Sequence, residues 1–507
     1  MNFSRKSGIL LHPTSLPGPY GMGEIGPSAR NFIQTLQSAG QTYWQVLPLG
    51  PTGYADSPYQ ALSSFAGNPM LISFDDLIED RLLKAEELQD FPNFTTRRVD
   101  YGPVLAFRQQ ILDKVCSLFS RRATKALKAD FKTFCEKEAA WLDDYALFVS
   151  LKEHYDLRPW VEWDVKYVTR DPVALKKFTQ ENASQLKRAR LRQFLFARQW
   201  TALREYAKQH GIQFVGDIPI FVAHDSSDVW ANQEMFYLDD KGHPTVVAGV
   251  PPDYFSATGQ LWGNPLYKWD LHKETGYVWW LKRMQHMVNL VDIVRIDHFR
   301  GFEAYWEVPG DEETAMNGTW VKGPAHDFFH AMKENMGDIP VIAEDLGVIT
   351  PEVDALRDDF DLPGMRILQF SFADDLEPHM QPEGFPENCV VYTGTHDNDT
   401  TFGWYHRQPG VNNTESAEVI EGEKHRVRVA VSTNGEQIHW DLIALAMRLR
   451  PHTAIVPLQD VLGLGTEARM NVPGRMDGNW SWRFEPKDIK SEDLQRLRDI
   501  TEWSGRG

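Results

Sequence analysis

The chain has 507 residues, of which 42 % are hydrophobic and 24 % are charged, and its formal net charge at pH 7 is −18. This composition is typical of a globular protein and excludes a disordered chain, and the length allows one large barrel with insertions or several ordinary domains. A strongly acidic chain repels phosphate backbones and anionic lipid surfaces, so we expect neither nucleic acid nor a membrane as a partner.

Cysteine usage and the N-terminal sequence bear on the compartment. The three cysteines, Cys116, Cys135 and Cys389, are too few and too scattered for a disulfide framework or a zinc site. The first residues lack the apolar core of a signal peptide, and no run approaches the roughly 18–20 apolar residues of a membrane span. We therefore expect a cytoplasmic protein, and we expect no metal and no cofactor.

Short apolar runs predict buried strands, and several of them end in a charged or polar residue. In chain order they are 43–49, 70–74, 212–222, 291–297, 339–345, 365–372, 389–397 and 453–460. Helical spacing of apolar residues predicts helices between the later runs, for example at 353–360 and 438–450. Buried parallel strands that alternate with helices are typical of an α/β (β/α)₈ barrel, or TIM barrel. The alternative is an open doubly wound sheet, but neither a GxGxxG after a strand nor a GxxxxGK[ST] is present.

Two spacings are too long for simple barrel connections. We expect 1–507 to be a single catalytic barrel domain in which roughly 80–200 form a mainly helical insertion. A second insertion, roughly 223–288, is rich in Gly, Pro, Asp and aromatic residues, which is typical of ordered loop. We expect this loop-rich insertion to form part of an active-site cleft.

The fourth predicted strand ends in Arg295 and Asp297. Alternate residues of a strand share a face, so these two side chains point the same way, and the guanidinium lowers the pKa of the carboxyl group. An ionised, oriented aspartate is what a covalent nucleophile requires. The alternative interpretation is a structural ion pair at the end of a strand.

Two further strands end in acids. Glu344 and Asp345 follow the fifth and should face opposite ways, and desolvation at the mouth of an apolar strand raises a carboxyl pKa, as suits a proton donor. Asp397 follows the seventh. The alternatives are acids that cap the following helices. Taken together, carboxyl groups on three strands of one barrel suggest retaining glycoside chemistry, which uses two carboxyl groups about 5–5.5 Å apart.

At this point the sequence resembles the α-amylase superfamily and, more narrowly, the amylomaltase or disproportionating-enzyme family of 4-α-glucanotransferases. The resemblance covers nearly the whole chain and is most specific in the strings GPTGYADSPYQALSSFAGNP (50–69) and GVPPDYFSATGQLWGNPLY (249–267). The other strings that carry it lie at 12–26, 216–230, 295–302, 343–347, 394–399 and 462–474.

The resemblance implies a role for each matching residue. Asp297 matches the nucleophile with Arg295 as its companion, Glu344 the general acid/base, and Asp397 the carboxylate that binds ring hydroxyls. Tyr254 and Phe255 match aromatics of a lid over the cleft, and the less favoured alternative is that they pack beneath their loop. The remaining positions that match substrate-binding residues are Ser57, Tyr59, Asp217, Trp262, Asn264, Pro265, His298, His396 and Asn471.

The family likeness also implies the reaction. The implied activity is transfer of an α-1,4-glucan segment to the 4-OH of an acceptor glucose or glucan by retaining double displacement, with α-1,4-glucans and maltooligosaccharides as partners. Residue chemistry alone leaves three alternatives: a plain α-glucan hydrolase, a metal-dependent barrel hydrolase, and a non-catalytic glucan-binding protein. The metal-dependent class is disfavoured because no HxH ends the first strand and no HExxH occurs.

Overall fold

The computed structural model describes residues 5–88, 91–252, 256–410 and 415–507. Within these ranges, eight parallel strands form one sheet in the order β10-β11-β12-β1-β2-β3-β6-β9. The edge strands meet where the N–H of Ala343 donates to the carbonyl of Pro363 at 2.9 Å, so the barrel is nearly closed. This confirms the predicted (β/α)₈ class. The barrel strands are β1 (Lys6–Leu10), β2 (Tyr43–Gln45), β3 (Gln213–Pro219), β6 (Ile293–Asp297), β9 (Val341–Ala343), β10 (Gly364–Ile367), β11 (Cys389–Tyr392) and β12 (Thr453–Pro457).

The predicted strand at 70–74 is wrong. Its first residues form a 3₁₀ turn (Pro69–Leu71), and Ser73 caps the next helix by accepting a hydrogen bond from the N–H of Asp76. Two glutamines of helix α8 (Ala183–Gln209) replace a neighbouring strand along residues 67–73. Gln199 bonds both the N–H and the carbonyl of Ser73, and Gln193 does the same for Gly67, at 2.7–3.0 Å. The true first strand is β1, whose sequence KSGIL is too polar to stand out.

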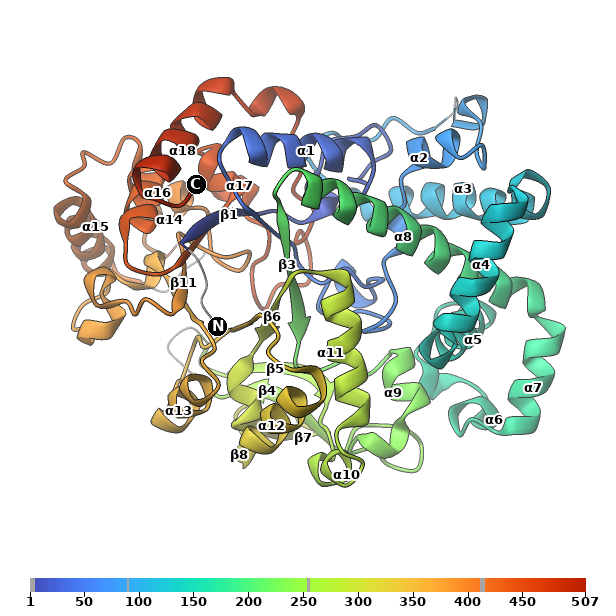
Figure 1. The fold of residues 1–507 in the computed structure, drawn as a ribbon. Coiled ribbons are helices and arrows are strands. Elements are labelled where there is room, and N and C mark those ends of the chain that lie inside the picture. The colour runs from blue at the N-terminus through green and yellow to red at the C-terminus, as the bar shows by residue number, and fades with distance from the viewer. Residues whose placement is uncertain (1–4, 89–90, 253–255, 411–414) are drawn as a thin grey trace.

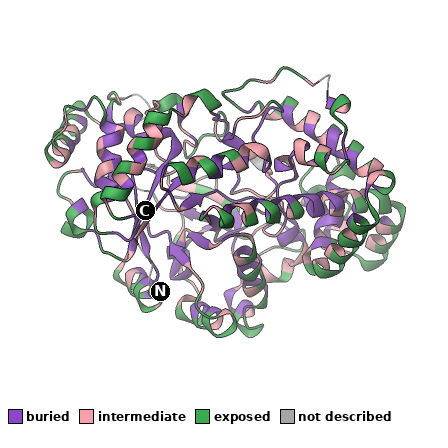
Figure 2. Ribbon diagram, turned by 45° about the horizontal axis from the view of Figure 1, so that its top comes forward, coloured by how far each residue is buried: buried purple, intermediate pink, exposed green. Residues whose placement is uncertain are grey.

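Helices cover the barrel on its outside, with buried residues on the faces toward the barrel and exposed residues on the outer faces (Figure 2). Figure 1 shows α4 to α7 gathered at one side of the barrel. Between β2 and β3 lie α2 (Phe74–Glu79), α3 (Tyr101–Arg122), α4 (Lys125–Lys137), α5 (Ala139–His154), α6 (Val165–Val168), α7 (Pro172–Glu181) and α8 (Ala183–Gln209). The others are α1 (Pro27–Ser38), α9 (Ser227–Ala231), α10 (Trp269–Glu274), α11 (Val278–Leu290), α12 (Ala325–Met336), α13 (Pro351–Asp359), α14 (Thr401–Tyr405), α15 (Ala417–Val431), α16 (Ile438–Arg448), α17 (Leu458–Val461) and α18 (Ser491–Trp503).

A second, antiparallel sheet lies beside the barrel in the order β5-β4-β7-β8. The composition of the segment 223–288 predicts mostly loop. In the structure, this segment contains two strands of the antiparallel sheet, the helices α9 and α10, and most of α11. The sheet's other two strands follow β6, so this sheet joins the segment to the chain just beyond Asp297. Its strands are β4 (Val246–Val250), β5 (Gln260–Pro265), β7 (Ala304–Pro309) and β8 (Thr319–Lys322).

Close packing inside the barrel decides some residue identities. Gly8 of β1 lies so near β2 that an added Cβ would stand 2.4 Å from the Cβ of Tyr43 and 2.5 Å from its carbonyl oxygen. A larger residue would therefore push the two strands apart.

None of the helices in the described part of the chain combines the length and the apolar character of a membrane span.

One buried arginine closes the N-terminal end of the barrel. Arg506 follows α18 and is fully buried, and its guanidinium bonds the end of α16, the connection that leads to β12, and the first residue of β1. Five carbonyl oxygens accept its hydrogen bonds at 2.7–3.1 Å, those of Lys6, Met447, Leu449, Pro451 and His452.

We expect the variant Arg506→Ala to lose about 3 kcal/mol of stability or more, because a charged hydrogen bond contributes about 1.5–3 kcal/mol and several are removed together. For a chain of this size this is a fall of about 3 °C or more in thermal midpoint. Differential scanning calorimetry measures it. The control is Arg121→Ala on the exposed last turn of α3, which should melt within about 1 °C of the parent. Equal midpoints for both variants would contradict the assigned role of Arg506.

Candidate active site

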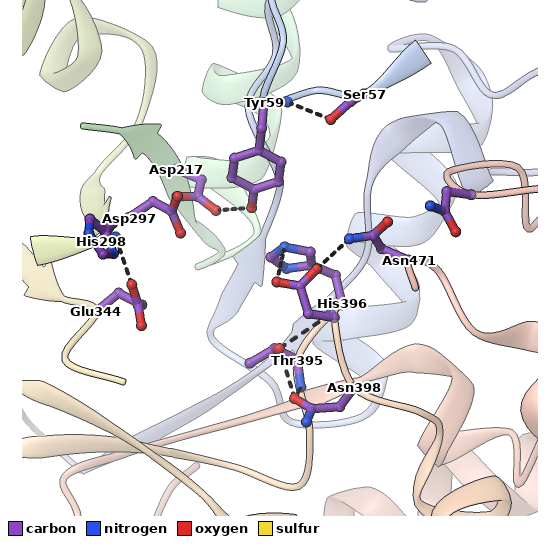
Figure 3. Close-up of polar contacts among 12 residues, drawn as sticks. Ser57, Tyr59, Asp217, Asp297, His298, Glu344, Thr395, His396, Asn398 and Asn471 are labelled. Atoms are coloured by element: carbon purple, nitrogen blue, oxygen red, sulfur yellow. Dashed lines mark hydrogen bonds and ion pairs between the residues drawn. The ribbon is translucent and has the colours of Figure 1, made fainter. Parts of the chain in front are cut away.

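The predicted carboxylates converge at the C-terminal ends of the barrel strands. Asp297 is the last residue of β6, Glu344 follows β9, and Asp397 follows β11, so they lie on the fourth, fifth and seventh strands as predicted. Figure 3 shows Asp297 and Glu344 on one side of the site and His396 on the other. This is the end of the barrel where (β/α)₈ enzymes carry their chemistry.

Arg295 is the centre of the charged cluster. Its Nη1 lies 2.7 and 2.8 Å from the two carboxylate oxygens of Asp217 and 2.9 Å from Oδ1 of Asp297. The hydroxyl of Tyr59 donates to Oδ2 of Asp217 at 2.7 Å. Burial lowers the pKa of Arg295, but the carboxylates of Asp217 and Asp297 outweigh this and hold it well above its ordinary value. The guanidinium is therefore charged and fixed between two strands.

The expected lowering of the pKa of Asp297 is wrong as a net effect. Burial raises this pKa to about 6, and the charge of Arg295 opposes the rise without cancelling it. The side chain lies deep in the site, although 28 % of it remains accessible. Asp297 is still mostly ionised at neutral pH.

Glu344 is held by backbone groups. Its Oε2 accepts from the N–H of His298 at 2.6 Å, and its Oε1 accepts from the N–H of Leu346 at 3.0 Å. Burial, followed by the negative charge of Asp297, raises its pKa to about 8, against the opposing effects of Arg295 and of these hydrogen bonds. Glu344 is therefore a neutral acid at pH 7 beside an ionised aspartate. Asp345 faces the other way, toward Arg357 and Arg366, as predicted.

Asp397 differs from the other two acids because its side chain is 48 % exposed. The segment after β12 holds it from one side. Nδ2 of Asn471 donates to Oδ1 of Asp397 at 2.6 Å, and Nη2 of Arg469 donates to its backbone carbonyl at 2.6 Å. The N–H of Asn471 also donates to the carbonyl of His396 at 3.0 Å.

Aromatic rings line the space around Asp397. The ring of Tyr59 stacks on His396 with centroids 5.2 Å apart and planes inclined by 17°, and Trp480 lies 5.9 Å from both. His12 is buried near His396, and burial together with the charge of His396 lowers the pKa of His12 to about 3. The neutral histidine and the stacked rings give this side of the site an apolar wall suited to a sugar face.

Sequence reasoning missed Arg469, Trp480 and His12 as individual residues. Arg469 and His12 stand inside strings that carry the family resemblance, which is the signal that could have found them. Trp480 has a positive φ of 60° and lies in a loop between short turns, with no motif around it.

The other predicted substrate-binding residues lie at several depths. Three of them lie on β5. The ring of Trp262 meets the ring of His298 edge-on, with centroids 4.8 Å apart. The side chain of Asn264 donates to the carbonyl of Val222 at 2.9 Å, and Pro265 is buried. Oγ of Ser57 accepts from the N–H of Tyr59 at 3.3 Å and so shapes that turn. Tyr254 and Phe255 lie outside the described residues.

A parallel barrel with paired carboxylates at its C-terminal mouth, one ionised and one protonated, defines the class of barrel enzymes that act on glycosidic bonds. Comparison with known proteins narrows this class. The family described as 4-alpha-glucanotransferase matches residues 11–489. The chain is 48 % identical to a 4-alpha-glucanotransferase of Thermus thermophilus over the full length of both, and 42 % identical to the chloroplastic/amyloplastic one of Solanum tuberosum over 100 % of this chain and 87 % of that protein.

Comparison with solved structures gives the same family. Amylomaltase from Streptococcus agalactiae in complex with acarbose is similar at 37 % identity and a TM-score of 0.94, over 99 % of this chain and 100 % of that one. The chain belongs to the 4-alpha-glucanotransferase family. The alternatives of a metal-dependent hydrolase and a binding protein are therefore set aside in favour of an α-1,4-glucan transferase.

We expect kcat/KM for maltotriose to follow a bell-shaped pH profile with limbs near pH 6 and pH 8. The sequence predicts Asp297 as the nucleophile and Glu344 as the proton donor. On this prediction, activity falls below the lower limb because Asp297 takes up a proton, and falls above the upper limb because Glu344 loses its proton. The two values belong to the interacting pair. Initial rates from pH 4.5 to 9.5 measure the profile, with tryptophan fluorescence as the control for unfolding. A rate that still rises above pH 9 would contradict the assignment of Glu344.

Proposed function

We propose that Asp297 is the nucleophile and Glu344 the general acid/base in transfer of α-1,4-glucan segments. The supporting observation is that the pKa of Asp297, about 6, lies below that of Glu344, about 8. Arg295, which pairs with both Asp217 and Asp297, helps to keep the pKa of Asp297 lower. Ionised nucleophile and protonated acid are the states in which a retaining enzyme begins its cycle. Both strands end at the same mouth, so one sugar unit can contact both groups.

In the first half-reaction, a carboxylate oxygen of Asp297 attacks C1 of the donor sugar. The bond from C1 to the leaving O4 breaks, and Glu344 gives its proton to that oxygen. In the second, the Glu344 carboxylate takes the proton from the 4-OH of the acceptor. The acceptor oxygen attacks C1, the ester bond breaks, and Asp297 regains its charge.

The remaining predicted residues are proposed to bind the substrate. Asp397, held by Asn471 and beside His396, is placed to accept hydrogen bonds from ring hydroxyls that strengthen as the sugar flattens toward the transition state. Tyr59 and Trp262 offer ring faces and edges for sugar packing. The proposed substrates are α-1,4-glucans and maltooligosaccharides. The free thiols Cys116, Cys135 and Cys389 suit the reducing cytoplasm, which is the proposed location.

The variants Asp297→Asn and Glu344→Gln each test the assignment. We expect each to lower kcat for maltotriose disproportionation by about 10³-fold or more, because each removes a group that reacts in the chemical step. Product analysis with reducing ends counted alongside is the measurement. The parent should give glucose plus longer oligosaccharides at a nearly constant number of reducing ends. A steady increase in reducing ends would instead indicate a hydrolase, and full activity in Asp297→Asn would refute the mechanism.

Tyr254 and Phe255 are proposed on sequence grounds as lid aromatics in the connection between β4 and β5. Transfer requires that water be excluded from the glycosyl intermediate, since water is present at about 55 M and competes with the acceptor. We expect Tyr254→Ala and Phe255→Ala to raise the ratio of hydrolysis to transfer several-fold. Chromatographic product ratios at fixed maltotriose measure this, with Tyr237→Ala, an exposed tyrosine before β4, as the control. An unchanged ratio in both lid variants would remove them from this role.

A further inference from the structure

Asp460 is a buried acid to which the mechanism above gives no role. It lies in α17, directly after β12, and only 1 % of it is exposed. Three hydrogen bonds from two threonines converge on its carboxylate. Oδ2 accepts from the hydroxyls of Thr393 at 2.5 Å and Thr401 at 2.7 Å, and Oδ1 accepts from the N–H of Thr401 at 2.7 Å.

The two threonines stand at the two ends of one loop. Thr393 follows the last residue of β11, and Thr401 is the first residue of α14. Between them lie His396 and Asp397, the groups on the Asp397 side of the site. A single carboxylate just after the eighth strand therefore ties both ends of the loop after the seventh strand.

Three side-chain contacts between these two segments lie nearer to solvent. Thr466 donates to the carboxylate of Asp399 at 2.8 Å, and Arg469 and Asn471 reach Asp397, in hydrogen bonds that involve exposed groups. Asp460 is the deeply buried member of the set. Because water cannot replace its hydrogen bonds at that depth, removal of the carboxylate leaves buried donors without an acceptor and releases the loop at its base.

We propose that Asp460 is a positioning residue that fixes the loop 393–401, so that Asp397 and His396 stay aligned with Asp297 and Glu344. The inference rests on the role proposed above for Asp397. Asp460 touches no substrate itself. It acts by setting the distance between the two halves of the site, and catalysis depends steeply on such distances.

We expect Asp460→Ala to lower kcat for maltotriose by about 10²-fold while KM changes less than about threefold, as for a site misplaced by about 1 Å. Asp460→Asn keeps the shape and an acceptor for the N–H of Thr401, and its kcat should lie between those of the parent and Asp460→Ala. The control is Asp292→Ala, at the opposite end of the barrel. Asp292 bonds the N–H of Phe214 and pairs with Arg204, so its loss should lower the thermal midpoint and leave kcat unchanged.

A double-mutant cycle separates positioning from general stability. In a chain that carries Asp397→Asn, the further change Asp460→Ala should cost less than about tenfold in kcat, because the group it positions is already impaired. An activated donor, α-maltotriosyl fluoride, keeps the residual rates measurable. A cost of 10²-fold in both backgrounds would overturn the proposal.

The double variant Thr393→Val/Thr401→Val keeps the test decisive if Asp460→Ala does not fold. Valine matches threonine in shape, so two hydrogen bonds are lost without a cavity, and kcat should fall about tenfold. An unchanged kcat would refute the positioning role. Full kcat in Asp460→Ala beside a large loss in Asp397→Asn would refute this inference alone, whereas full activity in Asp397→Asn would refute the proposed function.

Discussion

The shared guanidinium of Arg295 is the interaction on which the chemistry of this site depends. Strand register places Asp217 opposite Arg295 and Pro219 opposite Asp297, so one buried cation faces two carboxylates. A single positive charge cannot neutralise both. Burial raises the pKa of Asp297, and Arg295 opposes this rise so that Asp297 stays ionised at neutral pH. Burial and then the charge of Asp297 raise the pKa of Glu344 further, so the two pKa values stand in the order that a nucleophile and a proton donor require.

Around this centre, the site consists of two halves with different physical character. Asp297 and Glu344 belong to adjacent strands and are fixed by backbone and ion-pair contacts. Asp397 is half-exposed and depends on side chains of another segment, Asn471 and Arg469. In the proposed mechanism, a sugar between the two halves removes water from Asp397 and so strengthens the hydrogen bonds of this carboxylate.

Much of this arrangement is predictable from sequence. Runs such as 291–297 and 389–397 predict strands because their apolar residues are continuous, and the acids at their ends predict the site. The segment 70–74 misleads because the backbone of Ser73 bonds the side chain of Gln199, which lies more than a hundred residues away in the sequence, instead of a neighbouring strand. The pKa of Asp297 is mispredicted for a related reason: the neighbouring arginine is visible in the sequence, but the depth of burial is set by the whole fold. Trp480 and Arg469 reach the site only because the segment after β12 folds back over it.

The position of β1 in the barrel has a consequence for synthesis of the chain. β1 pairs with β2 on one side and with β12 on the other, so Lys6 meets Thr453 only after more than four hundred further residues. At about 5–20 residues per second, the outer edge of β1 stays without its partner strand for on the order of half a minute or longer. An unpaired edge is a template for wrong pairing. The nascent protein therefore passes through a long interval in which protection from association with other chains matters more than its final stability.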